Sequence, residues 1–260
     1  MFARFKSWIK ETITLMRYPL VAHNSRNVAR LFDGESFFTP GEAIIIGGLA
    51  AGGKTLFALT LLKAIHFATE IKWFHLNKNK RVSLFFSTEE DTTELLAKVP
   101  METKLADSEI IIKKLSTETI SNVCSHIKRI VAETANEPNL YLQCVVIDNS
   151  HLLKQSSDNN FYKALRKLAQ QYNFVVIFTQ AIKPHFHGRK SLDRRWLEMG
   201  NIELIHSRSV NEVDKVMYID VCHSGDRMFI KKGKHNGALR SPDINVQEIS
   251  MRNKTVALSI

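Results

Sequence analysis

The sequence contains few of the residues that make a chain flexible or cross-link it covalently. Its 260 residues include 11 Gly, 6 Pro and 3 Cys, and 44% of them are hydrophobic. So little Gly and Pro leaves little room for flexible linkers or disordered tails. Cys124, Cys144 and Cys222 are an odd number without CxxC spacing, which argues against a disulfide framework and a cysteine-based zinc site. A chain of this length can bury one full-sized core.

Long apolar runs are also missing. The sequence has no stretch of 18 apolar residues, and charged residues interrupt the apolar ones near the N-terminus, so no signal-peptide core is present. Membrane-spanning helices and secretory signals both require such runs. We therefore expect a cytoplasmic protein with reduced cysteines and no membrane partner.

Acidic residues are fewer than basic ones. The chain has 36 Lys and Arg against 26 Asp and Glu, which gives a formal charge of +10. An excess of this size favours a polyanionic partner, such as nucleic acid or an anionic membrane. Charge alone leaves ribosome binding and simple solubility open as alternatives.

The N-terminal segment has helical periodicity. Phe2, Phe5, Ile9, Ile13 and Met16 recur at helical spacing with charges between them, which predicts an amphipathic helix over residues 2–17 that ends near a proline at position 19. A basic amphipathic helix can bind a membrane, but packing on the protein's own core or on a neighbouring subunit is commoner. We expect residues 1–30 to form this helix and a linker arm, and residues 31–260 to form the main domain.

From residue 41 onward, short apolar runs alternate with longer amphipathic segments. This alternation is typical of an α/β fold with a mainly parallel sheet and helices on both faces. After residue 215 the short runs are separated by Gly and polar turns, which predicts a C-terminal antiparallel extension of the sheet. Strands are expected at 43–46, 81–86, 109–112, 143–147, 174–178, 216–221, 228–231, 245–249 and 255–258, and helices at 54–69, 117–135 and 158–172.

A glycine-rich segment follows the first of these strands. Residues 48–55 read Gly-Leu-Ala-Ala-Gly-Gly-Lys-Thr, which matches G-x-x-x-x-G-K-[ST] between a predicted strand and a predicted helix. The glycines let backbone N–H groups turn onto a β-phosphate, and the helix points its positive end at the same anion. The lysine would reach the β- and γ-phosphate oxygens, and the threonine hydroxyl would ligate Mg²⁺. The segment predicts an ATP and Mg²⁺ site formed by Gly48, Gly52, Gly53, Lys54 and Thr55.

Carboxylates at two other strand ends complete this site. Asp148 ends an apolar run, so it lies at the sheet edge where α/β folds bind ligands, and it could hold the Mg²⁺ water shell as a Walker B aspartate does. Asn149 follows it, so the acid that polarises the attacking water must come from elsewhere. Glu89 follows the second strand and is the candidate, although an acidic helix N-terminus is the alternative for this segment. Gln180, at the end of the next strand after Asp148, could sense the γ-phosphate.

The order of these parts resembles the RecA-type motor core of the DnaB-like hexameric replicative helicases and their small plasmid RepA-like relatives. The resemblance implies that residues 31–260 form a RecA-like P-loop ATPase domain, that Glu89 is the catalytic base, and that Gln180 couples nucleotide state to DNA-binding loops. It also implies a homo-oligomeric, hexameric ring on single-stranded DNA, in a bacterial, plasmid or phage replication context with an initiator, loader or primase as further partner. Its clearest pieces are residues 48–55, 85–89, 145–148, 175–180, 198–203 and 235–237.

The chain departs from the family at both ends of this core. Fewer than fifty residues precede the P-loop, so we expect no N-terminal primase-binding domain. The family's arginine before Asn-Gly acts across the subunit interface, and His235 stands in its place. We expect Lys234 to act as this trans-acting finger, supported by Lys232 and His235, because phosphoryl transfer needs positive charge on the γ-phosphate.

A basic segment follows Gln180. It combines basic residues with aromatic ones at 186 and 196, and such combinations neutralise phosphates and stack on bases. By the family resemblance, this segment would face the channel of the ring, whereas a solvated basic loop is the plainer alternative. The basic residues expected to contact nucleic acid are Lys183, Arg189, Lys190, Arg194 and Arg195.

Two functions fit this sequence best. The first is an ATP-dependent single-stranded DNA translocase or helicase that acts in replication as an oligomeric ring. The second is a non-unwinding RecA-class ATPase that loads or remodels a replication or recombination nucleoprotein complex. A small-molecule kinase would need a lid and an acceptor pocket, and a scaffold with a dead site would not need an intact phosphate loop.

Overall fold

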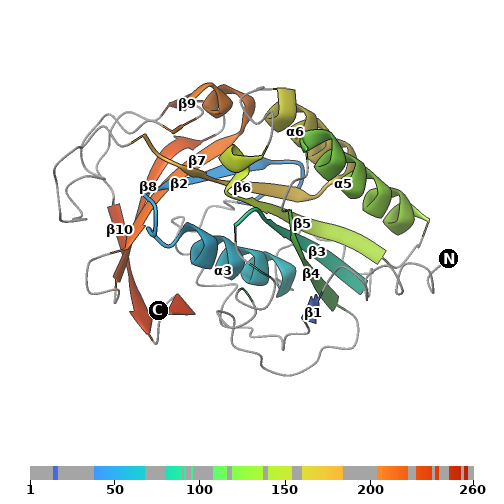
Figure 1. The fold of residues 1–260 in the computed structure, drawn as a ribbon, viewed down its shortest axis with the longest axis horizontal. Coiled ribbons are helices and arrows are strands. Elements are labelled where there is room, and N and C mark those ends of the chain that lie inside the picture. Colours follow the sequence, from blue (N-terminus) through green and yellow to red (C-terminus); the bar gives the residue numbers. More distant parts are fainter. Residues whose placement is uncertain are drawn as a thin grey trace.

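The computed structural model describes residues 14–16, 38–67, 80–89, 91, 95, 108–115, 119–136, 140–153, 160–183, 204–205, 207–221, 227–235, 238–239, 246–252 and 255–256. These residues form an α/β fold (Figure 1). Cys124 and Cys144 are free thiols. Among the described helices, none is long and apolar enough to cross a membrane.

One mixed sheet contains all the described strands, in the order β1-β4-β3-β5-β6-β2-β7-β8-β10-β11, with β9 paired to β8. Six neighbouring strands, from β4 to β7, run parallel. Antiparallel pairing begins where β8 joins β7 and continues through β10 and β11. The strands are β1 Thr14–Met16, β2 Ala43–Gly48, β3 Lys80–Ser87, β4 Ser108–Lys114, β5 Leu140–Asp148, β6 Val175–Ala181, β7 Lys215–Val221, β8 Arg227–His235, β9 Ala238–Leu239, β10 Val246–Arg252 and β11 Thr255–Val256.

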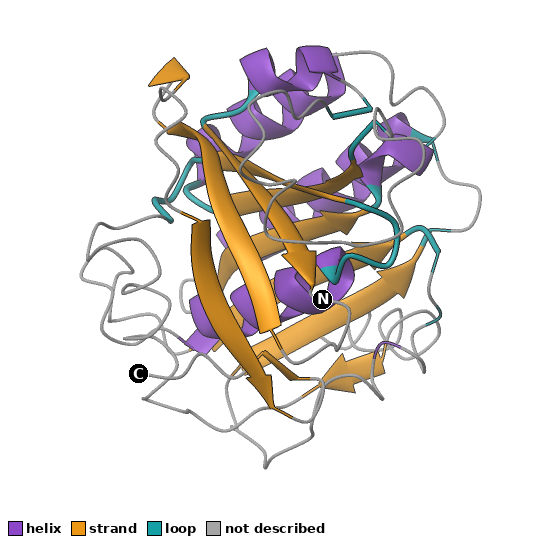
Figure 2. Cartoon of the chain, turned by 90° about the vertical axis from the view of Figure 1, so that its left-hand side faces the viewer, coloured by secondary structure: helices purple, strands orange, loops and turns teal. Residues whose placement is uncertain are grey.

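Helices cover the parallel part of the sheet on both faces (Figures 1 and 2). Helix α3, Lys54–Phe67, packs one apolar layer against the sheet with Phe57, Leu61 and Ile65. Helices α5, Ile120–Ala135, and α6, Asn160–Tyr172, pack the other layer. Two short 3₁₀ helices, η1 Ser150–Leu152 and η2 Ser207–Glu212, follow β5 and precede β7. Because both faces are covered, the central strands can be apolar throughout, as all six residues of β2 are buried.

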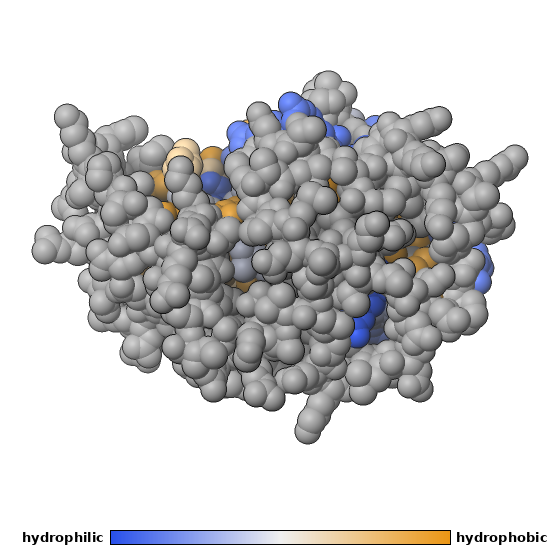
Figure 3. All heavy atoms as spheres, turned by 90° about the horizontal axis from the view of Figure 1, so that it is seen from below, coloured by the Kyte–Doolittle hydropathy of each residue, from blue (hydrophilic) through white to orange (hydrophobic). Residues whose placement is uncertain are grey.

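Figure 3 shows the described residues that are visible from below: blue hydrophilic areas lie at the upper rim, at the right and in recesses, and orange hydrophobic areas lie in recesses. Among the described residues, the large hydrophobic side chains that are exposed are Leu152, Tyr172 and Ile205. The buried hydrophobic residues form two clusters, one on each face of the sheet.

The end of the predicted N-terminal helix is a strand instead. Residues Thr14–Met16 form β1 and pair antiparallel with β4, with Thr14 opposite Ile112, so the prediction of a helix through Arg17 is wrong for these residues. The backbone of β4 would otherwise present unpaired N–H and C=O groups at the sheet edge, and pairing with β1 satisfies them. The rest of that helix prediction, and most of the arm at 1–30, lies outside the described residues.

Helix α3 is held at the end far from the phosphate loop by polar side chains. Gln143 Nε2 donates to the backbone oxygen of Ile65 and the Arg81 guanidinium donates to that of His66, so last-turn carbonyl groups of α3 find partners. The His66 ring lies 2.8 Å from Ser83 Oγ. Burial, with a smaller contribution from the charge of Arg81, lowers the pKa of His66 to about 3. The imidazole is therefore neutral near pH 7 and adds no buried charge beneath the helix.

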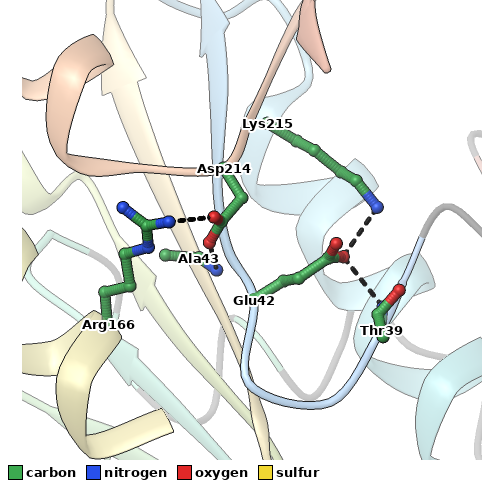
Figure 4. A network of polar contacts seen from close by, with 6 residues as sticks. All are labelled: Thr39, Glu42, Ala43, Arg166, Asp214 and Lys215. Atoms are coloured by element: carbon green, nitrogen blue, oxygen red, sulfur yellow. Dashed lines mark hydrogen bonds and ion pairs between the residues drawn. The ribbon is translucent and has the colours of Figure 1, made fainter. Parts of the chain in front are cut away.

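An ion pair joins the beginnings of β2 and β7, at the sheet edge opposite the phosphate loop (Figure 4). Lys215 Nζ lies 2.6 Å from Glu42 Oε2, and the lysine side chain is 1% exposed. The same carboxylate oxygen accepts the backbone N–H of Thr39 at 2.9 Å. The adjacent Asp214 accepts the backbone N–H of Ala43 and pairs with Arg166 of α6. These contacts fix β7 beside β2 and thereby place the far end of β7 against the phosphate loop.

We predict that Lys215→Met destabilises the fold by about 2 kcal/mol, because it leaves Glu42 without its counter-ion. The expected cost is below that of a fully buried pair, since Glu42 keeps the Thr39 N–H and some exposure. The second change Glu42→Gln in the Lys215→Met background removes the unpaired charge and should recover at least half of the loss. Urea denaturation measures both values. A double variant as unstable as the single one would contradict the ion-pair account.

Candidate functional site

The phosphate loop connects the end of β2 to the start of α3. Within it, the Gly52 N–H donates to the Leu49 oxygen at 3.0 Å, and the Phe57 N–H makes a helical bond to the Gly53 oxygen. The first turn of α3 contains no acidic residue. The N–H groups at a helix N-terminus carry partial positive charge and lack helical partners, so an anion at this loop and helix end, which the sequence predicts, would meet a favourable field.

Two glycines allow β7 and β8 to pack against the loop. Gly53 has φ +77°, and a Cβ there would lie 2.6 Å from Val221 Cγ2. A Cβ on Gly48 would lie 2.9 Å from the Ile219 backbone oxygen and 3.0 Å from Lys54 Cγ. Larger residues at either position would push the loop away from β7 or displace the lysine.

Lys54 lies inside the loop and is 7% exposed. Its Nζ donates to the Leu49 oxygen at 2.7 Å. Burial lowers the pKa of Lys54, and the negative charges of Asp148 and Glu89 oppose this effect. The structure therefore brings together the three charged residues that the sequence assigned to this site.

Asp148 connects three elements through its carboxylate, which is fully buried. Thr55 Oγ1 of α3 donates to Oδ2 at 2.9 Å. Thr179 Oγ1 of β6 donates to Oδ1 at 2.6 Å and accepts the Asn149 N–H at 2.6 Å. Strand β6 lies between β5, which ends at Asp148, and β2, which leads into the phosphate loop. The threonine on this intervening strand thus bridges the two halves of the site.

Glu89 lies two residues beyond the end of β3, whose last residue is opposite Asp148. It is exposed, and its Oε2 accepts a hydrogen bond from Asn149 Nδ2 at 2.5 Å. The preceding residue, Thr88, donates through Oγ1 to the Asp148 backbone oxygen at 3.2 Å. The candidate base is thus tied to the same strand end that carries the candidate metal ligand.

Gln180 points to the other face of the sheet from Thr179. It is fully buried, and its Nε2 donates to Tyr162 OH at 2.7 Å and to Ser209 Oγ at 3.0 Å. Burial raises the pKa of Tyr162 to about 12, so the phenol is protonated near neutral pH. The role of Gln180 as a γ-phosphate sensor remains a prediction. In the structure, its side chain contacts α6 and η2.

The other predicted residues lie farther along the chain. Lys183 follows β6 and is partly exposed, whereas Arg189, Lys190, Arg194 and Arg195 lie outside the described residues. Lys232, Lys234 and His235 belong to β8. Because β8 is antiparallel to β7, Met228 lies beside the phosphate loop and Lys234 is opposite Val216 at the far edge. The two residues are six positions apart along the strand, about 20 Å, so Lys234 lies too far along β8 to reach the phosphate loop of its own chain.

The hydroxyl of Thr55 and the carboxylate of Asp148 fit a magnesium ion. Mg²⁺ prefers oxygen ligands and is commonly held by one or two protein groups together with substrate phosphates and water. In the described part of the chain, no group of three or more His, Cys, Asp or Glu side chains could hold a metal by itself. A site of this kind therefore depends on the nucleotide for its remaining ligands.

Sequence reasoning missed two residues of the site. Thr179 lies in a run that reads as an apolar strand, and only the neighbouring strand order reveals that its hydroxyl meets Asp148. Asn149 was noted only as a residue that is not Glu, although an amide directly after a strand-ending aspartate was a usable signal.

Neither models of known protein families nor curated protein sequences match this chain.

We predict that Thr179→Val destabilises the protein by about 2–4 kcal/mol, since it removes a donor to buried Asp148 and the acceptor of the Asn149 N–H. Valine has the same shape, so packing is kept. Thr179→Ser retains the hydroxyl and should stay within about 1 kcal/mol of wild type. Chemical denaturation gives both numbers. A loss in Thr179→Ser as large as that in Thr179→Val would contradict this explanation, because serine keeps the hydroxyl.

Proposed function

We propose that this protein is a P-loop ATPase with a RecA-type core that hydrolyses ATP to ADP and phosphate. The observation that carries the proposal is the hydrogen bond from Thr55 to Asp148, with Glu89 fixed beside it through Asn149. These two contacts bring together the phosphate loop, a second candidate Mg²⁺ ligand and a candidate base, which are the parts that ATP hydrolysis requires.

The residues divide the chemistry between them. The loop N–H groups and the α3 N-terminus would hold the β-phosphate, and Lys54 would neutralise charge on the β- and γ-phosphate oxygens. Thr55 and Asp148 would hold Mg²⁺, which when bound supplies charge stabilisation to the transferring phosphoryl group. Glu89 would orient a water molecule and accept its proton as the water oxygen attacks the γ-phosphorus and the bond to the ADP oxygen breaks.

The proposed work of this ATPase is translocation on single-stranded DNA as an oligomeric ring. The resemblance to DnaB-like and RepA-like motors supports this, together with the charge of +10 and the basic segment that begins near Lys183. Lys234 lies far from the phosphate loop of its own chain, which supports an action on the nucleotide of a neighbouring subunit. A non-unwinding ATPase that loads or remodels a nucleoprotein complex would use the same catalytic site.

We predict that Lys54→Ala abolishes ATP turnover, because no other described residue donates positive charge inside the loop. Glu89→Gln should keep MgATP binding and lose hydrolysis by about 10²–10⁴-fold, the usual effect of removing a general base. Phosphate release and binding of a fluorescent ATP analogue distinguish the two variants. Wild-type turnover in Lys54→Ala would refute the site assignment.

Strand displacement distinguishes the two proposed activities. A translocase should unwind a forked DNA substrate in an ATP-dependent way and lose this ability in Glu89→Gln. A remodelling ATPase should show ATP hydrolysis stimulated by single-stranded DNA without displacement. Hydrolysis indifferent to single-stranded DNA would remove the nucleic-acid part of the proposal and leave the ATPase.

A further inference from the structure

Asn149 is held rigidly at the end of β5. It is 6% exposed and has a left-handed backbone conformation, with φ 50°. Its N–H donates to Thr179 Oγ1 at 2.6 Å, and its backbone oxygen accepts the Leu152 N–H at 2.9 Å. Thr88 Oγ1 also donates to this oxygen at 3.4 Å. Because both backbone groups are bonded, the side-chain amide leaves the strand in a defined direction.

Glu89 differs from Asn149 in exposure and support. It is exposed and follows the end of β3, and a glutamate side chain there has several rotamers to choose from. Among the described residues, the hydrogen-bond partner of its carboxylate is Asn149, whose Nδ2 donates to Glu89 Oε2 at 2.5 Å. The other oxygen, Oε1, is left to accept a proton from water.

We infer that Asn149 is a positioning residue for the hydrolysis of ATP, acting by holding Glu89 Oε2 so that Oε1 faces the attacking water. The inference rests on the ATPase proposed above. An amide suits this task because it donates a hydrogen bond and carries no charge, so it does not compete with Glu89 for the proton. An aspartate at position 149 would repel the glutamate, and a glycine would leave it without a partner.

The backbone conformation of Asn149 makes a clean test possible. Glycine and aspartate both tolerate a left-handed conformation, so Asn149→Gly and Asn149→Asp should fold. Asn149→Gly should lower kcat about 10- to 100-fold, the effect expected when a reacting group loses its orientation, with MgATP affinity within about twofold of wild type. Asn149→Asp should lose at least as much despite its nearly identical shape.

A matched control exists at the opposite edge of the sheet. Asn173 also has a left-handed conformation, with φ 56°, and precedes β6 by two residues. In the described part of the chain, Tyr141 OH donates a hydrogen bond to the backbone oxygen of Asn173, and a substitution keeps this oxygen. Asn173→Gly should therefore leave kcat unchanged, which separates the loss of the Asn149 amide from a general effect of glycine in this conformation.

A double-mutant cycle tests whether Asn149 acts through Glu89. In a Glu89→Gln background, adding Asn149→Gly should change the remaining single-turnover rate by less than about twofold, because the group that it positions is already gone. Full additivity of the two losses, an unchanged kcat in Asn149→Gly, or faster hydrolysis in that variant would each overturn the inference. If wild type hydrolyses no ATP, the proposed ATPase fails instead, so the two failures are distinguishable.

Discussion

The buried carboxylate of Asp148 is the constraint on which the rest of the site depends. A charge without exposure is costly unless donors surround it, and the hydroxyls of Thr55 and Thr179 supply them. Thr55 belongs to α3, the helix after the phosphate loop, and Thr179 belongs to β6, the strand between β5 and β2. Compensation of one charge therefore fixes α3, β5 and β6 relative to one another.

The same arrangement orders the groups that would meet a nucleotide. Thr179 accepts the Asn149 N–H, and the Asn149 amide in turn holds Glu89, so a chain of hydrogen bonds leads from the metal-ligand position to the candidate base. Lys54 lies within electrostatic reach of both carboxylates. The proposed metal coordination and proton transfer thus fall to side chains of one hydrogen-bond network, in which the loss of one member is felt by the others.

The opposite edge of the sheet has a supporting function. Lys215, the first residue of β7, pairs with Glu42, the residue before β2. The far end of β7 then packs Ile219 and Val221 against the phosphate loop. A neutral His66 and the carbonyl partners at the end of α3 hold the helix from the other side. The loop is therefore held by packing from β7 and by its own helix, and the N–H groups proposed to bind the phosphate are held with it.

Sequence reasoning identified the elements near the site well, because local patterns determine them. The apolar run of β2, the loop motif and the strand end at Asp148 each appear where the sequence predicts. The roles of Thr179 and Asn149 depend on strand order, which brings together residues far apart in the chain. The strand at Thr14–Met16 was missed because helical periodicity was the local signal, whereas the unpaired edge of β4 decided the outcome.

The proposed ATPase requires that the loop at residues 48–55 binds the β-phosphate of a nucleotide. Isothermal titration of the purified chain with ADP and with AMP, both in Mg²⁺, tests it most directly. We predict measurable binding of ADP, its loss in Lys54→Ala, and no comparable binding of AMP, which lacks the β-phosphate that the loop and α3 would hold. Equal affinity for ADP and AMP, or ADP binding that survives Lys54→Ala unchanged, would contradict the account.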